Sequence, residues 1–277
     1  MTPSILITGA GRGLGLYLVL RFLEAGFVVF AGTRQPSPNL AKLRESSPDR
    51  FFEISLDVTS RQSLTSAAAE VAKRVMSVDI LLNNAAILPE EGRGPFEELA
   101  VDVGLQVYDV NALGPLRTTQ AFLPLLEKGQ RRLIVNISSE AGSIGNCWRK
   151  DEFLYCMSKS ALNMQTMILK NLLSPRGFEL LAIHPGWLRT DMGGPNADLD
   201  PKEAAEGIFL LTTQPRQSGS EIHRPSREAH AVVRSDKIRL IPGGTWHNFE
   251  RFSSCMSSLL TPAGFDLEAR YRCGNRA

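Results

Sequence analysis

The chain of 277 residues lacks the features that mark several classes of protein. It has no apolar run long enough to span a bilayer, and its start, MTPSILITGAGRG, has no basic segment followed by a long apolar one. Its net charge of +2 gives no strongly basic surface of the kind that attracts nucleic acid or an anionic membrane. These absences predict a cytoplasmic protein with no nucleic-acid partner and no membrane partner.

Cysteine is also scarce, and the four cysteines show neither CxxC spacing nor a Cys/His pattern typical of a zinc site: Cys147, Cys156, Cys255 and Cys273. In a reducing compartment we expect free thiols, and we predict no metal site. Apolar residues make up 43% of the chain and charged residues 22%, which is ordinary for a globular protein. The length suffices for one large domain with a full core.

Short apolar runs alternate with longer stretches of helical period, from SILIT and GLGLYLVLRFLEAG to RLIVNIS and ELLAIHPG. Strands and helices in regular alternation predict right-handed βαβ units. Strands that are continuously apolar predict a sheet covered on both faces. We therefore expect an α/β fold over residues 1–213, with a Rossmann-type, doubly wound parallel sheet of six to seven strands flanked by helices.

A glycine-rich turn, TGAGRGLG at residues 8–15, follows the first predicted strand and leads into a helix. Such a turn aims backbone amides and the positive helix N-terminus at an anion, and small residues let a pyrophosphate approach the backbone. The strict GxGxxG pattern is not met, because a leucine occupies the third glycine position. The turn still predicts a dinucleotide site, formed by Gly9, Gly11, Arg12, Gly13, Leu14 and Gly15.

The second predicted strand ends in AGTRQ, with Thr33 and Arg34 where an enzyme that uses NAD usually has an acidic residue. A guanidinium group suits a 2′-phosphate, and Arg12 is a second cation in the glycine turn. NADP(H) is therefore the expected cofactor. The alternative is that both arginines are ordinary surface residues.

The stretch YCMSK places Tyr155 four residues before Lys159, so both side chains share one face of a helix. An ammonium group that favours phenolate would lower the pKa of the tyrosine from about 10 toward a working range. A surface tyrosine beside a solvated lysine has the same spacing. The surrounding motifs must therefore decide between the two interpretations.

Seven motifs occur in a fixed order: TGxxxGxG, LDV at 56–58, NNAA at 83–86, Asn111, IVNISS at 134–139, YxxxK, and HPG at 184–186. Their order and intervals resemble the classical short-chain dehydrogenase/reductase family over about residues 4–213. The segment HPGWLRTDMGG is similar to the carbonyl reductases of the sniffer and C-factor type. The resemblance implies an oxidoreductase that transfers hydride from NADPH to a carbonyl group.

The resemblance also implies the roles of individual residues. Tyr155 would donate the proton, Lys159 would bind the nicotinamide ribose, Ser139 would hold the substrate oxygen, and Asn111 would position a water of the proton relay. This chemistry is physically reasonable, since an alkoxide formed by hydride transfer needs a proton donor within reach. The cofactor-binding set would be completed by Asp57, Val58, Asn84, Ala85, Ala86, Pro185, Gly186, Trp187, Leu188 and Thr190.

Ser139 precedes Tyr155 by sixteen residues, which is longer than the usual interval of the family. The intervening residues predict a lengthened loop. Ser143 is a rival at closer spacing, but we favour Ser139 because the end of a strand fixes its position.

Residues that follow the strand ends would border the substrate, since open α/β sheets bind ligands there. They are Leu88, Ile144, Trp148, Trp187 and Met192. This mostly apolar set predicts a moderately bulky ketone, aldehyde or imine, although plain packing of a lid explains the tryptophans equally well. A cofactor-binding signalling or scaffold protein without turnover is the alternative to an enzyme.

Residues 214–277 depart most from the family. Residues 216–277 contain ten Arg or Lys and six Asp or Glu, without long helical period, so a solvated segment and a basic partner surface both stay open. We expect this segment to belong to the same domain, as a substrate lid or an oligomer contact. The stretch KIRLIPGGTW at 237–246 resembles the closing strand of other members, and a homodimer or homotetramer is expected through helices around 111–126 and 155–173.

Overall fold

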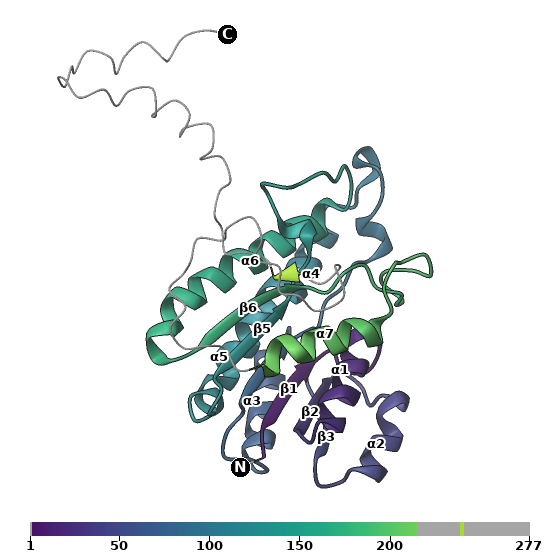
Figure 1. Cartoon of the computed structure of the whole chain (residues 1–277). Helices are drawn as coiled ribbons and strands as arrows, with labels where there is room; N and C mark the ends of the chain where they lie inside the picture. The colour runs from purple at the N-terminus through teal and green to yellow at the C-terminus, as the bar shows by residue number, and fades with distance from the viewer. Residues whose placement is uncertain (1, 215–238, 241–277) are drawn as a thin grey trace, which may run out of the picture. The chain divides into compact units, whose positions relative to one another are not determined.

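The computed structural model of the protein describes residues 2–214 and 239–240, and these contain one seven-stranded sheet (Figure 1). The order of its strands is β3-β2-β1-β4-β5-β6-β7. The first six are parallel, and β1 lies between β2 and β4 and pairs with both. The predicted doubly wound sheet is therefore confirmed, with its strands at Ser4–Thr8, Val28–Thr33, Phe51–Ser55, Ile80–Asn83, Leu133–Ile137 and Glu179–His184 for β1 to β6.

The last strand, β7 (Arg239–Leu240), lies within the stretch that resembles a closing strand. It pairs antiparallel to β6, with Ile183 opposite Leu240, whereas the prediction was a parallel sheet. The predicted lid or oligomer contact otherwise falls on residues 215–238 and 241–277, outside the described residues. Cys255 and Cys273 also lie there.

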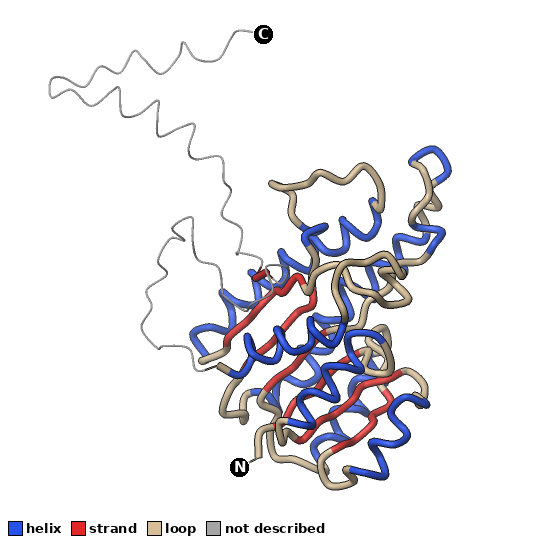
Figure 2. The backbone as a smooth tube through the Cα atoms, turned by 45° about the vertical axis from the view of Figure 1, so that its right-hand side comes forward, coloured by secondary structure: helices blue, strands red, loops and turns tan. Residues whose placement is uncertain are grey.

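Helices cover both faces of the sheet, as Figures 1 and 2 show. Because side chains alternate along a strand, Ile5 and Ile7 of β1 pack in one apolar cluster and Leu6 packs in another. The first cluster includes residues of the adjoining helices α1 and α7, and the second includes residues of α3, α5 and α6. The helices are α1 (Gly13–Glu24), α2 (Ala41–Ser46), α3 (Arg61–Ala72), α4 (Val103–Tyr108), α5 (Gly114–Leu126), α6 (Phe153–Leu173) and α7 (Pro201–Thr213).

A short chain of buried amides fixes α6 against the sheet. Asn83 Nδ2 of β4 donates to Asn136 Oδ1 of β5 at 2.8 Å, and Asn136 Nδ2 donates to Thr166 Oγ1 of α6 at 2.8 Å. A buried polar network of this kind favours one arrangement of its elements, because breaking its bonds would leave further unpaired groups in the core, where Asn83 Oδ1 already has no hydrogen-bond partner. It therefore determines where α6 presents Tyr155 and Lys159.

The helices of the described residues include none long and apolar enough to cross a membrane. Across residues 2–214 and 239–240, no group of three or more His, Cys, Asp or Glu could hold a metal ion. Cys147 and Cys156 are free thiols.

Candidate active site

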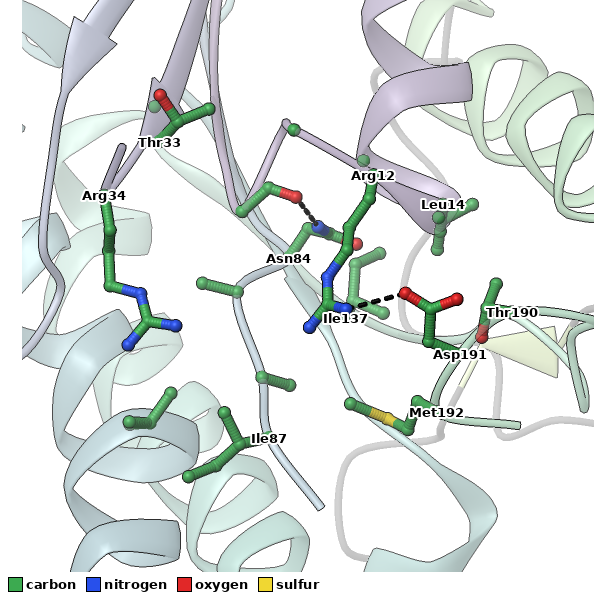
Figure 3. A pocket seen from close by; sticks show the side chains of 18 of the residues that line it. Arg12, Leu14, Thr33, Arg34, Asn84, Ile87, Ile137, Thr190, Asp191 and Met192 are labelled. Atoms are coloured by element: carbon green, nitrogen blue, oxygen red, sulfur yellow. Dashed lines mark hydrogen bonds and ion pairs between the residues drawn. The ribbon is translucent and has the colours of Figure 1, made fainter. Parts of the chain in front are cut away.

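A cavity of about 900 Å³ lies where the carboxyl ends of the parallel strands meet (Figure 3). Its wall is formed by the glycine turn, the ends of β2 and β4, part of α6 and the segment that follows β6. Such a crevice is where open α/β sheets bind nucleotides. Most residues of the predicted cofactor set line it, namely Gly9, Gly11, Arg12, Gly13, Leu14, Gly15, Thr33, Arg34, Asp57, Val58, Asn84, Ala85, Ala86, Tyr155, Lys159, Pro185, Gly186, Leu188 and Thr190.

The glycine turn is packed so closely that two of its positions admit no side chain. Gly9 has φ +65°, and a Cβ there would lie 2.8 Å from the Cα of Ala85. A Cβ on Gly15 would lie 2.2 Å from the carbonyl oxygen of Gly9. Asn84 Nδ2 donates to that same oxygen at 3.1 Å. The turn thereby delivers the N-terminus of α1, which has no acidic residue in its first turn, to the cavity as an anion site.

At the end of β2, a buried carboxylate organises the segment that carries Arg34. Glu53 of β3 accepts hydrogen bonds from Thr33 Oγ1 at 2.9 Å and from the amide of Ser37 at 2.8 Å, and Arg44 pairs with it. Glu53 is therefore engaged by protein groups rather than free to bind a ribose. The sequence gives no signal for this contact, because Glu53 lies on another strand.

Arg12 has a partner that the sequence did not predict. Its guanidinium group is 2.6 Å from Asp191 Oδ2, in the segment after β6, and both side chains are about three-quarters exposed (Figure 3). The prediction named Arg12 as a second cation for a phosphate of the cofactor, and in this structure Arg12 pairs with Asp191. An exposed ion pair of this kind is weak, so an anionic ligand can compete for Arg12.

Asp57 borders the cavity as a carboxylate. Its Oδ1 accepts hydrogen bonds from the amide and the hydroxyl of Thr59, at 2.9 and 2.7 Å. Partial burial opposes ionisation, but these bonds and the charge of Arg34 lower the pKa of Asp57 below its ordinary value.

Ser139, which follows β5, lies beside Tyr155 of α6, close enough for its hydroxyl group to affect the pKa of the phenol. Ser139 Oγ also donates to Glu140 Oε2 at 2.6 Å and accepts from the amide of Ala141 at 3.1 Å. Ser143 Oγ instead accepts from the amide of Asn146 at 3.3 Å, within the loop. The structure therefore brings Ser139, rather than its rival, to the tyrosine across the longer interval.

The protonation of this pair differs from the expectation. Burial raises the pKa of Tyr155 above its ordinary value; the hydroxyl of Ser139 opposes the rise, and the charges of Glu140 and Glu152 add to it. Lys159 is buried and its Nζ donates to the carbonyl oxygen of Ile137 at 2.8 Å, and burial lowers its pKa to about 8. The expected lowering of the phenol's pKa is not found in this structure, because burial, the largest contribution, raises the pKa of Tyr155 instead.

Asn111 lies on a π-helical turn, Asp109–Leu113, between α4 and α5. Its side chain accepts from the amide of Ile87 at 2.8 Å and donates to the carbonyl oxygen of Ile87 at 2.9 Å and to Ser158 Oγ at 3.1 Å. These bonds use both amide protons and tie the segment after β4 to α6. Such turns are frequent at functional sites.

Only some of the predicted substrate residues line the cavity. Met192 lines the cavity, as does Ile87, while Leu88 is half-buried nearby in the chain. Ile144 and Trp148 are more than 70% exposed, with values of 71% and 72%. Trp187 was also assigned to the cofactor, but it is not part of the lining of this cavity. The residue is 54% exposed, and its Nε1 donates to the carbonyl oxygen of Gly193 at 2.9 Å.

Comparison with known proteins agrees with this geometry. The family model described as short chain dehydrogenase matches residues 3–200. The chain belongs to this family. An uncharacterized oxidoreductase of Schizosaccharomyces pombe is 37% identical over 222 residues, which cover 78% of this chain and 87% of the relative.

Two solved structures of similar fold are carbonyl reductases. The NADPH-bound carbonyl reductase from chicken fatty liver is 33% identical, with a TM-score of 0.70, covering 77% of this chain and 92% of its own. Carbonyl reductase Sniffer of D. melanogaster is 28% identical, with a TM-score of 0.73, covering 78% and 94%. The resemblance to the sniffer type is confirmed.

Proposed function

We propose that this oxidoreductase is an NADPH-dependent reductase of a ketone, an aldehyde or an imine, with Tyr155 as the proton donor. The observation that carries the proposal is that Tyr155, with Ser139 beside it, lines the same cavity as Lys159. The NADPH-bound carbonyl reductase among the similar structures supports the choice of cofactor.

The residues around the cavity fit a phosphorylated dinucleotide. The close packing at Gly9 and Gly15 leaves the backbone and the helix N-terminus exposed to a pyrophosphate. Arg34, which lines the cavity, would bind the 2′-phosphate, and the engagement of Glu53 by Thr33 and Ser37 supports this choice because it leaves no free carboxylate of Glu53 for a ribose. Arg12 would exchange Asp191 for a phosphate group of the cofactor.

NADPH would supply the hydride, and the residues of the chain would manage the proton and the charge. Because burial raises its pKa, Tyr155 holds its proton at neutral pH and is a weaker acid than a free phenol, so it would donate only to an oxygen on which negative charge develops. Ser139 would provide a second polar contact to that oxygen. Lys159 would bind the nicotinamide ribose, and Asn111 would position a water of the proton relay.

Substrate class follows from the apolar residues at the open end of the cavity. Ile87 and Met192 line it, and Ile144 and Trp148 offer further exposed apolar surface on the loop that precedes α6. These groups favour a moderately bulky apolar substrate over a small hydroxy acid. We also propose that the enzyme acts in the cytoplasm.

A homo-oligomer is part of the proposal. Four large apolar side chains of α6 are exposed at helical spacing: Met157, Met164, Ile168 and Leu172. Leu105 and Tyr108 of α4, a helix that contacts α6, are exposed as well. A continuous apolar face of this extent fits a second copy of the same chain.

Calorimetric titration with NADPH and NADH tests the cofactor assignment. Wild-type protein should bind NADPH more tightly, and Arg34→Ala should weaken NADPH binding at least tenfold while changing NADH binding less than twofold, because one charge-assisted contact is worth ~1.5–3 kcal/mol. Arg176→Ala, which removes an arginine whose ion pair with Glu127 is unconnected to the cavity, is the control. Equal affinities for the two cofactors would overturn the assignment.

A further inference from the structure

The 143–152 loop, which separates Ser139 from Tyr155, contains a charged contact that the mechanism above does not use. Arg149 pairs through one nitrogen with Glu140 Oε1 and through the other with Glu152 Oε2. Its side chain is only 21% exposed, and its guanidinium carbon lies 5.3 Å from the ring centroid of Trp148. One guanidinium fork thus spans two carboxylates, a geometry that a lysine cannot reproduce.

The two carboxylates belong to the two segments that present the reacting hydroxyl groups. Glu140 follows Ser139 directly, at the start of the 3₁₀ turn Glu140–Gly142, and its other oxygen accepts the hydrogen bond of Ser139 Oγ. Glu152 is the N-cap of α6, three residues before Tyr155. Arg149 therefore connects the end of β5 to the start of α6 by a shorter route than the loop.

Two observations concern the carboxylates at the ends of this connection. Glu152 has φ +52° and ψ +37°, a left-handed conformation that costs a residue with a side chain of the order of 1 kcal/mol and persists only where contacts enforce it. Hydrogen bonds from Ser139 and Arg149 outweigh partial burial and lower the pKa of Glu140 to about 2. Glu140 is therefore a carboxylate at any working pH and fixes the direction of the Ser139 proton.

The hydrogen bond from Ser139 to Glu140 limits what the serine hydroxyl can do in the site. A hydroxyl has one proton, so donation from Ser139 Oγ to Glu140 competes with donation to Tyr155 or to a substrate oxygen. His184 of β6 also faces Glu140, with Nδ1 at 3.6 Å from Oε2. The orientation of Ser139 toward Tyr155 thus depends on where Glu140 is held.

We propose that Arg149 is a positioning residue that holds Ser139 and Tyr155 in register across the lengthened loop, by bridging Glu140 and Glu152. This inference rests on the proposed function, since it concerns the same pair of hydroxyl groups. It explains how an interval of sixteen residues still brings the serine to the tyrosine.

Kinetics provides the first test. Arg149→Ala should lower kcat at least tenfold with NADPH affinity within twofold, and Arg149→Lys should restore less than half of the loss. The double variant Glu140→Gln/Arg149→Ala should lose about as much kcat as the more damaging of the two single variants, because both substitutions break the same bridge. If kcat of Arg149→Ala stays within twofold of wild type, or if the two losses multiply, the proposal is wrong.

Hydrogen exchange in the absence of substrate separates this proposal from the proposed function. The amides of Ala141 and Gly142 report on the Ser139 segment, since they donate to Ser139, and the amide of Cys156 reports on the first turn of α6, since it donates to the carbonyl oxygen of Glu152 at 3.0 Å. In Arg149→Ala, amide exchange should accelerate at least tenfold in both the Ser139 segment and the first turn of α6. In the control Arg176→Ala, exchange should be unchanged in both segments.

The two readouts fail independently. Wild-type protein that turns over no carbonyl or imine would contradict the proposed function, whereas exchange would still test the bridge. Faster exchange confined to the 143–152 loop itself, with both reporter segments unchanged, would overturn the bridge even in an active enzyme.

Discussion

Burial of Lys159 predicts a dependence of stability on pH that can be worked out from the structure. The side chain is 2% exposed, and burial lowers its pKa from 10.5 to about 8. Below pH 8 the lysine is protonated in the folded and the unfolded state, and the folded state bears the cost of a buried charge. Between pH 8 and 10.5 the folded protein loses this proton first, so stability rises with pH.

The magnitude follows from the two pKa values. A difference of this size corresponds to about 3 kcal/mol at ~1.4 kcal/mol per pKa unit, of which ~2–3 kcal/mol should be released between pH 7 and pH 10. Lys159→Met removes the titrating group and keeps a side chain of similar length. The hydrogen bond to the carbonyl oxygen of Ile137 is lost in this variant at every pH, so it cancels from the comparison.

Urea unfolding of wild type and Lys159→Met at pH 7, 8, 9 and 10 is the assay. The free energy of unfolding of wild type minus that of the variant should rise by ~2–3 kcal/mol across the series, because all other titrating groups are common to both proteins. A difference that stays constant within error would refute the burial argument, and a difference that falls with pH would mean that the folded state stabilises the ammonium.

Two further changes test the glycine turn and the oligomer. In Gly15→Ala the added Cβ would lie 2.2 Å from the carbonyl oxygen of Gly9, so this variant should be destabilised by ~1–3 kcal/mol and should bind NADPH at least tenfold more weakly in titration. Gly145→Ala is the control, because nothing lies within 4 Å of its Cβ, and neither its stability nor its NADPH affinity should change. Equal effects of the two substitutions would contradict the packing argument. Ile168→Glu should convert the oligomer to a monomer in analytical ultracentrifugation without loss of helical circular dichroism, whereas an unchanged sedimentation coefficient would place the interface elsewhere.

The local patterns of the chain were sufficient to predict its sheet and its glycine turn. Continuous apolar strands and amphipathic helices depend on residues close in sequence, so periodicity identifies them. Tyr155 and Lys159 were recognisable because one helix turn separates them. The antiparallel pairing of β7 was missed, since an apolar stretch carries no information on the direction of its partner.

Contacts between distant segments were not predictable. The ion pair of Arg12 with Asp191 joins residues 179 positions apart, and the bridge from Arg149 depends on a left-handed residue at Glu152 that no motif marks. The raised pKa of Tyr155 was missed for a similar reason, because desolvation depends on the packing around the phenol rather than on its neighbours in sequence.

The central claim is that Tyr155 donates a proton during NADPH-dependent reduction. The most direct test is NADPH oxidation by wild type and Tyr155→Phe with a panel of cyclic and aromatic ketones, aldehydes and imines, after NADPH binding has been measured for both. General acid catalysis is worth ~10²–10⁴, so turnover by the variant should fall at least a hundredfold while NADPH affinity stays within twofold. Turnover by Tyr155→Phe equal to that of wild type would contradict the account.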